Sequence, residues 1–172
     1  MATYKELKGF KVQSLPAAPV AQTGQYEAGA WSTGGNLNQA RDAFDCMGIG
    51  SQTATLAAGG RFSAADSALT ESYNGTAWTE VNDLNTARYI LAGAGTSTLG
   101  LVFSGNTTVN VAVTEEWDGV SWTEVADLST TRLVADAGFG TQSLALAASG
   151  GPPAPVATEE WSKAQNVEII TD

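Results

Sequence analysis

Three stretches of the sequence are versions of one another: YEAGAWSTGGNLNQAR at residues 26–41, YNGTAWTEVNDLNTAR at 73–88 and WDGVSWTEVADLSTTR at 117–132. In each, an aromatic residue precedes a tryptophan by five positions, and an arginine follows that tryptophan by ten. The second stretch begins 47 residues after the first, and the third begins 44 residues after the second. A fourth start, TEEW at 158–161, repeats the TEEW at 114–117 but is not followed by a second tryptophan. So many shared spacings indicate a tandem repeat.

The repeated positions are assigned to the fold, because a catalytic site joins residues with different jobs and has no reason to recur in every repeat. We predict that the second tryptophan of each repeat packs between neighbouring modules. Each arginine is expected to stack on an aromatic ring or to bind a nearby carboxylate such as Asp83 or Asp127. The repeated structural positions are Tyr26, Trp31, Arg41, Tyr73, Trp78, Arg88, Trp117, Trp122, Arg132 and Trp161.

Turn and strand signals divide each repeat into four short strands. Asn74-Gly75 and Asp118-Gly119 predict two-residue hairpin turns between the first aromatic residue and the tryptophan, because these residues tolerate the positive φ of a type I′ turn. Two nearly continuous apolar runs follow the arginine, and such runs indicate strands that are covered on both faces. The runs lie at residues 44–50 and 55–58, 89–95 and 99–103, and 133–140 and 144–148.

Four strands in about 45 residues is the pattern of a β-propeller blade. With Gly59-Gly60 and Gly150-Gly151 after apolar strands, the spaced aromatic residues and the arginine make residues 23–161 resemble the kelch repeat. The resemblance implies an all-β fold, a kelch-like β-propeller with three four-stranded blades per chain. Three blades leave exposed edges, and kelch propellers usually close with about six. We therefore expect a homodimer, or a higher homo-oligomer, in which two chains complete a six-bladed ring.

The repeat sequence, NGTAWTEVNDLNTAR with GAGT, and the opening sequence MATYKELKG resemble the sequences of kelch-like structural proteins of marine and cyanobacterial tailed phages. This similarity implies a virion structural protein, a capsid decoration or a tail or fibre-associated module, assembled in the host cytoplasm. Its partners would be copies of itself and other virion proteins. The alternative is a receptor- or glycan-binding propeller module, for which residues 150–157 offer the longest irregular loop. A glycosidase is a third hypothesis.

Residues 1–22 are expected to form an arm in front of a propeller half at 23–172. Lys5, Lys8 and Lys11 stand against one glutamate in this arm, whereas the whole chain has a net charge of −10. The prolines near its end predict an extended conformation. We expect the arm to dock on another copy or on a neighbouring protein. The acidic remainder makes nucleic acid an unsuitable partner, and no apolar segment is long enough to suggest a membrane partner.

The residues that most catalytic sites need are scarce, because the sequence has no histidine and one cysteine, Cys46. The adjacent carboxylates Glu115-Glu116 and Glu159-Glu160 are the strongest candidates for acid–base chemistry. Adjacent residues on a strand point to opposite faces, so neither pair can converge on one bond. Because both pairs occupy the same repeat position, we expect them on a solvated outer strand. We predict no catalytic residue, no metal, no cofactor and a protein that is not an enzyme.

Overall fold

The computed structural model describes residues 4–7, 10–13, 29–42, 47–133, 138–151 and 156–164. Every regular element within these ranges is a β-strand, and all strand pairs are antiparallel. No helix in this part of the chain has the length and apolarity to cross a membrane. The chain forms two compact units, Met1–Ser32 and Thr33–Asp172.

The first unit contains a hairpin of β1 (Tyr4–Leu7) and β2 (Phe10–Gln13). The backbone of Lys5 pairs with Val12 and that of Lys11 with Glu6. The expectation of an extended arm thus differs from the structure over these residues, because the chain turns back on itself between the two strands. Lys8 and the proline-containing stretch lie outside the described residues.

The second unit contains three sheets of matching strand order. Sheet I consists of β3 (Met47–Ser51), β4 (Ala54–Ala58), β7 (Thr70–Tyr73) and β8 (Trp78–Val81). Sheet II consists of β9 (Ala92–Gly95), β10 (Gly100–Phe103), β11 (Thr114–Trp117) and β12 (Trp122–Glu124). Sheet III consists of β13 (Gly138–Gly140), β14 (Leu144–Ala148) and β15 (Thr158–Ser162). The short hairpin of β5 (Arg61–Phe62) and β6 (Ala65–Asp66) was not predicted.

The four-strand reading of the repeat is confirmed for sheets I and II. Tyr73 ends β7 and pairs with Trp78 at the start of β8, and Trp117 pairs with Trp122 in the same way. The prediction of type I′ turns is wrong, because the backbone φ is positive at Gly75 and Gly119 but not at the residues before them. Instead, the preceding Asn or Asp side chain accepts two backbone N–H groups of the turn, an Asx-type arrangement.

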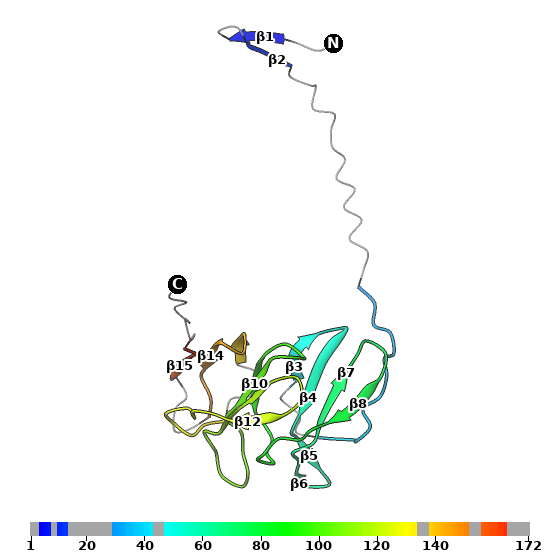
Figure 1. Ribbon diagram of the computed structural model, residues 1–172, viewed down its shortest axis with the longest axis vertical. Coiled ribbons are helices and arrows are strands. Elements are labelled where there is room, and N and C mark those ends of the chain that lie inside the picture. The colour runs from blue at the N-terminus through cyan, green and yellow to red at the C-terminus, as the bar shows by residue number, and fades with distance from the viewer. Residues whose placement is uncertain are drawn as a thin grey trace, which may run out of the picture. The chain divides into compact units, whose positions relative to one another are not determined.

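The three sheets lie side by side in chain order, with sheet II in the middle (Figure 1). The first strands make the closest approach, since β9 contacts both β3 and β13. Gly138 of β13 allows this approach, because a Cβ at that position would lie 2.4 Å from the carbonyl oxygen of Gly93 in β9. The predicted small residues of these strands therefore serve close sheet packing.

Two apolar cores fill the spaces between neighbouring sheets. The first core, between sheets I and II, consists of Ile49, Leu56, Ala58, Leu84, Leu91, Val102, Trp117 and Trp122. The second core, between sheets II and III, consists of Ala92, Ala94, Leu101, Phe103, Ala145 and Ala147, with Trp161 packed against it. Residues of β10 alternate between the two cores, so this strand is covered on both faces as predicted.

Candidate functional site

One polar cluster recurs at three places in the second unit, and we call each copy a junction cluster. It joins an Asn or Ser and an Arg from a loop to a Glu at the second position of the third strand of a sheet. The members are Asn38, Arg41 and Glu71 in the first cluster, Asn85, Arg88 and Glu115 in the second, and Ser129, Arg132 and Glu159 in the third.

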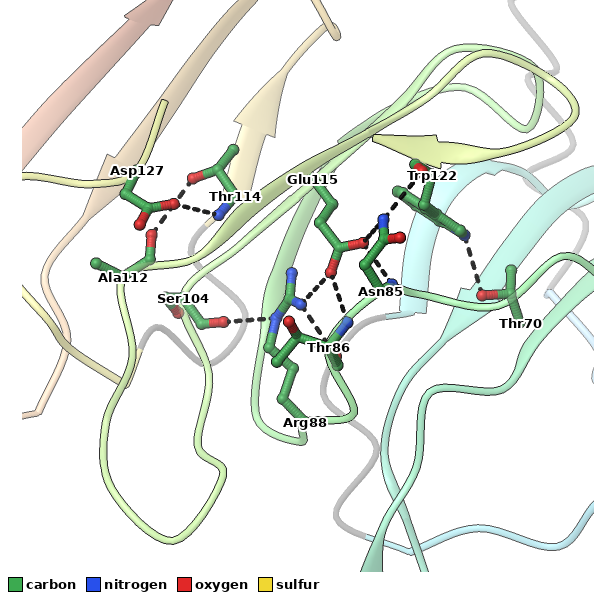
Figure 2. Close-up of polar contacts among 10 residues, drawn as sticks. All are labelled: Thr70, Asn85, Thr86, Arg88, Ser104, Ala112, Thr114, Glu115, Trp122 and Asp127. Carbon is green, nitrogen blue, oxygen red and sulfur yellow. Dashed lines mark hydrogen bonds and ion pairs between the residues drawn. The ribbon is translucent and has the colours of Figure 1, made fainter. Parts of the chain in front are cut away.

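The second cluster ties sheet I to sheet II, because Asn85 and Arg88 follow β8 whereas Glu115 lies on β11 (Figure 2). The backbone and side-chain amides of Asn85 donate to Glu115 Oε2 at 2.7 and 2.8 Å. Arg88 pairs with Glu115 Oε1 and donates through Nε to the Ser104 carbonyl at 3.0 Å. The Asn85 side chain also donates to the carbonyl of Trp122 at 2.9 Å. Through Glu115 and Asn85, the loop after β8 is therefore fixed to both β11 and β12 of sheet II.

The first cluster repeats the asparagine contacts, and in the third cluster a serine stands in place of the asparagine. The arginine contacts differ, because Arg41 and Arg132 each donate through Nη1 to two backbone carbonyls, whereas Arg88 donates through Nε to Ser104 and through Nη1 to Thr86. Asn38 donates to Glu71 Oε2 and, through its side chain, to the carbonyl of Trp78 at 3.0 Å. At the equivalent place in the third cluster stands Ser129, whose backbone amide donates to Glu159 Oε2 at 2.7 Å. Serine lacks the amide that reaches the fourth strand in the other sheets, and sheet III has three described strands.

Because these ion pairs are buried, each charged side chain depends strongly on its partner for stabilisation. The side chains of Arg41 and Arg88 are fully buried, as is Glu115, whereas Glu159 keeps 24% of its side-chain surface exposed. A buried charge that loses its partner is costly, because no water replaces the lost interaction. Burial also lowers the pKa of the Arg132 guanidinium.

Hydrogen bonds keep the carboxylate of Glu71 ionised. Burial by itself would raise its pKa, but the backbone amide of Asn38, the Arg41 guanidinium, the Asn38 side chain and the Gln39 amide together hold the pKa below its ordinary value of 4.5. The cluster is therefore a site at which charge is neutralised and fixed.

The predicted partners of the arginines were the wrong carboxylates. Asp83 and Asp127 instead accept the backbone amides of Thr70 and Thr114, at 3.0 Å each. The expectation that the acidic pairs lie on a solvated strand is wrong for Glu115, which is fully buried.

The acidic neighbours do point to opposite faces, as predicted. Glu115 binds the loop of sheet I, whereas Glu116 accepts Lys163 Nζ of sheet III at 2.7 Å. The signal that sequence reasoning missed is the recurrence of the first glutamate at a spacing of 44 residues, at Glu71, Glu115 and Glu159. These glutamates recur in step with the repeated arginines, so the recurrence would have identified them as the arginines' partners.

The tryptophans expected between modules differ in burial. Trp122 is buried in the first core, and its indole N–H donates to Thr70 Oγ1 of sheet I at 3.1 Å (Figure 2). Trp78 is half-buried. Trp31 belongs to the first unit and has an exposure of 104% within this chain, above the reference value for an extended peptide, so its packing between modules stays a prediction. Trp122 packs against sheet I, the sheet that precedes its own in the chain.

The other repeated aromatic residues line the sheets. Tyr73 stacks at a tilt on Trp78 with ring centroids 5.0 Å apart, and Trp117 stacks on Trp122 at 5.2 Å. Trp161 donates its indole N–H to the carbonyl of Gln142 at 2.8 Å. Tyr26 and Cys46 lie outside the described residues.

The face of sheet III that points away from sheet II exposes apolar side chains beside the carboxylate of Glu160, and we call it the open face. Phe139 of β13 and Leu146 of β14 are register partners on this face. Their counterparts in sheet II, Ala94 and Leu101, are 3% and 0% exposed, whereas Phe139 is 56% exposed. The open face therefore has the composition of a sheet interface and lacks a neighbouring sheet.

Within the described ranges, no three Cys, Asp or Glu side chains are grouped so that they would hold a metal ion. No protein-family model matches the sequence, and no curated protein is similar to it.

Proposed function

We propose that the chain is a non-catalytic structural module that assembles with copies of itself. The observation that carries this proposal is the recurrence of one polar cluster at three junctions. In each copy the ionisable groups bind a loop to a strand, and in the second and third copies that loop follows the preceding sheet, so two sheets are joined. A catalytic site would need a set of groups that differs from its repeats.

The proposed architecture is a kelch-like β-propeller in which the sheets are blades. Antiparallel four-strand order, first strands lying closest together and apolar cores between neighbouring sheets all support it. Three blades make an arc with two unfinished ends, and the open face is one of them. We propose that a second copy covers it, so that two chains close a six-bladed ring.

The proposed setting is a tailed-phage virion, as a decoration, tail or fibre-associated component. The support is the similarity of the repeat sequence to those of kelch-like structural proteins of tailed phages. A second support is the separate N-terminal unit, which would dock on a neighbouring virion protein. Deleting residues 2–22 is expected to abolish incorporation into virions while leaving the β-sheet circular dichroism of the chain unchanged. Incorporation of the deleted chain at the wild-type level would contradict docking through the arm.

Self-assembly is tested by light scattering of the purified chain over a range of concentrations. The proposal expects a defined oligomer, a dimer if two arcs close the ring. A monomer at every concentration would overturn it. Substitution of an exposed residue remote from the open face, such as Phe62→Ala in the β5–β6 hairpin, is the control and should leave the oligomer intact.

Glycan recognition is the second candidate, because a shallow depression beside the open face joins aromatic rings to a carboxylate. It is lined in part by Phe139, Leu144, Glu160 and Trp161. A glycan array with a hit that Phe139→Ala abolishes would favour this function. Absence of any hit, with a stable oligomer, would favour assembly.

A further inference from the structure

A pocket between sheets II and III occupies the place that Trp122 fills between sheets I and II. Strand register defines the equivalence, since β10 pairs with β11 as β14 pairs with β15. Around Trp122, the first core contains Leu56, Ala58, Leu84, Val102 and Trp117, and Thr70 binds its indole. The pocket is lined by the residues at the same positions one module later, namely Leu101, Phe103, Thr114, Leu128, Ala147 and Trp161.

The pocket is thus a socket for an indole. The pocket is partly open to solvent. Its lining joins apolar side chains to the carboxylates of Asp127, Glu159 and Glu160, and Thr114 stands where Thr70 accepts the indole N–H in the neighbouring core. Large aromatic side chains that enter such pockets dominate the free energy of many interfaces.

The sequence of the chain does not supply this indole at the expected place. In sheets I and II the tryptophan lies five residues after the last aromatic residue of the third strand, and at that distance from Trp161 the residue is Asn166. An asparagine side chain is smaller than an indole and would leave the apolar part of this lining unfilled, which is unfavourable. Trp31, by contrast, opens a segment with the repeat sequence and is fully exposed.

We propose that Trp31 of a second copy fills the socket, and that residues 30–34 of that copy pair with β15 as the fourth strand of sheet III. This inference rests on the proposed function, and it names the contact through which two copies would assemble. The register of the other sheets, Tyr73 with Trp78 and Trp117 with Trp122, places Trp31 opposite Trp161. Ser32 then lies opposite Glu160.

The same chain cannot reach its own socket. The backbone of Gly35 lies against the turn after β7, since a Cβ there would be 2.5 Å from the carbonyl oxygen of Thr76. Trp31 is four residues away along the chain, and four residues span at most ~14 Å. Sheet II separates sheet I from sheet III, and two sheet spacings are about 20 Å. The strand must therefore come from another copy.

Disulfide cross-linking between two singly substituted proteins tests the register and the exchange together. Both carry Cys46→Ser; one carries Ser32→Cys and the other Glu160→Cys. Directly opposed residues on antiparallel strands are about 5 Å apart, within disulfide reach, whereas diagonal neighbours are about 7–8 Å apart. The mixture is expected to form a cross-linked dimer that reducing agent dissolves.

The matched control replaces Glu160→Cys by Ser162→Cys, which lies one diagonal step away in this register. It should cross-link much less. Equal cross-linking of both pairs, or of neither, would overturn the proposal. So would an intramolecular disulfide between Glu160→Cys and Val167→Cys in one chain, because it would show that the chain's own residues 166–169 take the fourth-strand place.

Removal of the indole gives an independent measurement. Trp31→Ala is expected to raise the dimer dissociation constant by at least about 30-fold, the loss typical of a buried aromatic anchor. Phe62→Ala, an exposed aromatic residue elsewhere, is the matched control and should leave the constant unchanged. A stable dimer whose constant Trp31→Ala does not alter would refute the socket while the self-assembly function stands; a monomeric wild-type chain would refute both.

Discussion

At the scale of single residues, the junction clusters combine two opposing effects of burial. Removing a carboxylate and a guanidinium from water is unfavourable, yet each carboxylate regains an ion pair and backbone N–H donors. Such a pair adds little stability over an apolar pair of the same shape. Losing one partner, however, leaves the other charge buried and alone.

The first prediction concerns Arg88. Arg88→Ala should lower the free energy of unfolding by about 3–5 kcal/mol, because Glu115 would remain buried without its cation. In a domain of this size the melting temperature should fall by about 10 °C. Arg61→Ala, which breaks a partly exposed pair with Asp66 and removes a cation–π contact with Tyr89, should cost only about 1–2 kcal/mol. Equal effects of the two substitutions in thermal melts would show that burial does not decide the outcome.

The second prediction concerns pH. The folded-state pKa of Glu71 is lowered, so its ionised form stabilises the fold above the unfolded-state value of 4.5, and this contribution is lost as pH falls through the lowered pKa. Urea unfolding should show wild type more stable than Glu71→Gln at pH 7. The difference should shrink steadily below about pH 4.5. A difference that stays constant down to pH 3 would mean that the charge of Glu71 is not what stabilises the cluster.

At the scale of elements, the asparagine of a junction cluster decides how firmly the fourth strand is held. Asn85 reaches both the carboxylate on β11 and the first carbonyl of β12. Ser129 makes the equivalent backbone contact only to β15. Serine thus replaces asparagine in the third module, and this is the module whose fourth strand we assign to another copy.

The third prediction converts the second cluster into the third. Asn85→Ser should destabilise the chain by about 1–3 kcal/mol, because two hydrogen bonds are lost and one of them is to a charged group. Asn82→Ser removes one exposed bond, to the carbonyl of Val120, and should cost about 0.5 kcal/mol. Chemical denaturation of both variants checks the difference. Equal costs would show that the link to β12 has no special weight.

At the scale of the whole molecule, the position of a strand in the row of sheets decides what it faces. β10 has a neighbouring sheet on each side and is buried throughout. In β14, Ala145 and Ala147 are buried against sheet II, whereas the alternate residues face outward and are partly or fully exposed. Two strands at equivalent positions of the repeat thus differ in burial because one is at the end of the row.

The fourth prediction places a charge on the open face. Phe139→Lys should dissociate the oligomer into folded monomers, because a lysine would be buried without a partner once a second copy covers this face. Val156→Lys, at a residue that is already 91% exposed, is the control and should leave assembly unchanged. Light scattering measures the mass and circular dichroism the fold. An intact oligomer of Phe139→Lys would place the interface elsewhere.

The extent of sequence prediction can be judged from these particular residues. The strands were predictable, because turns at Asn74 and Asp118 and the apolar runs recur with the repeat. The arginine partners were not, since Asp83 and Asp127 lie five residues from Arg88 and Arg132, whereas the actual partners lie about 30 residues from the arginines, in the third strand of a sheet. Only strand pairing brings that strand to the arginine.

The sequence by itself determined the repeat, the all-β class and the strands of each module, because turn chemistry and apolar patterning act over a few residues. The tertiary structure alone decided that Glu115 is buried and that Trp122 has a socket. These properties depend on which sheet lies next to which. Equivalent strands of the repeat acquire different surroundings at the middle and at the end of the row, and the apolar pattern within one strand does not show which sheet will lie beside it.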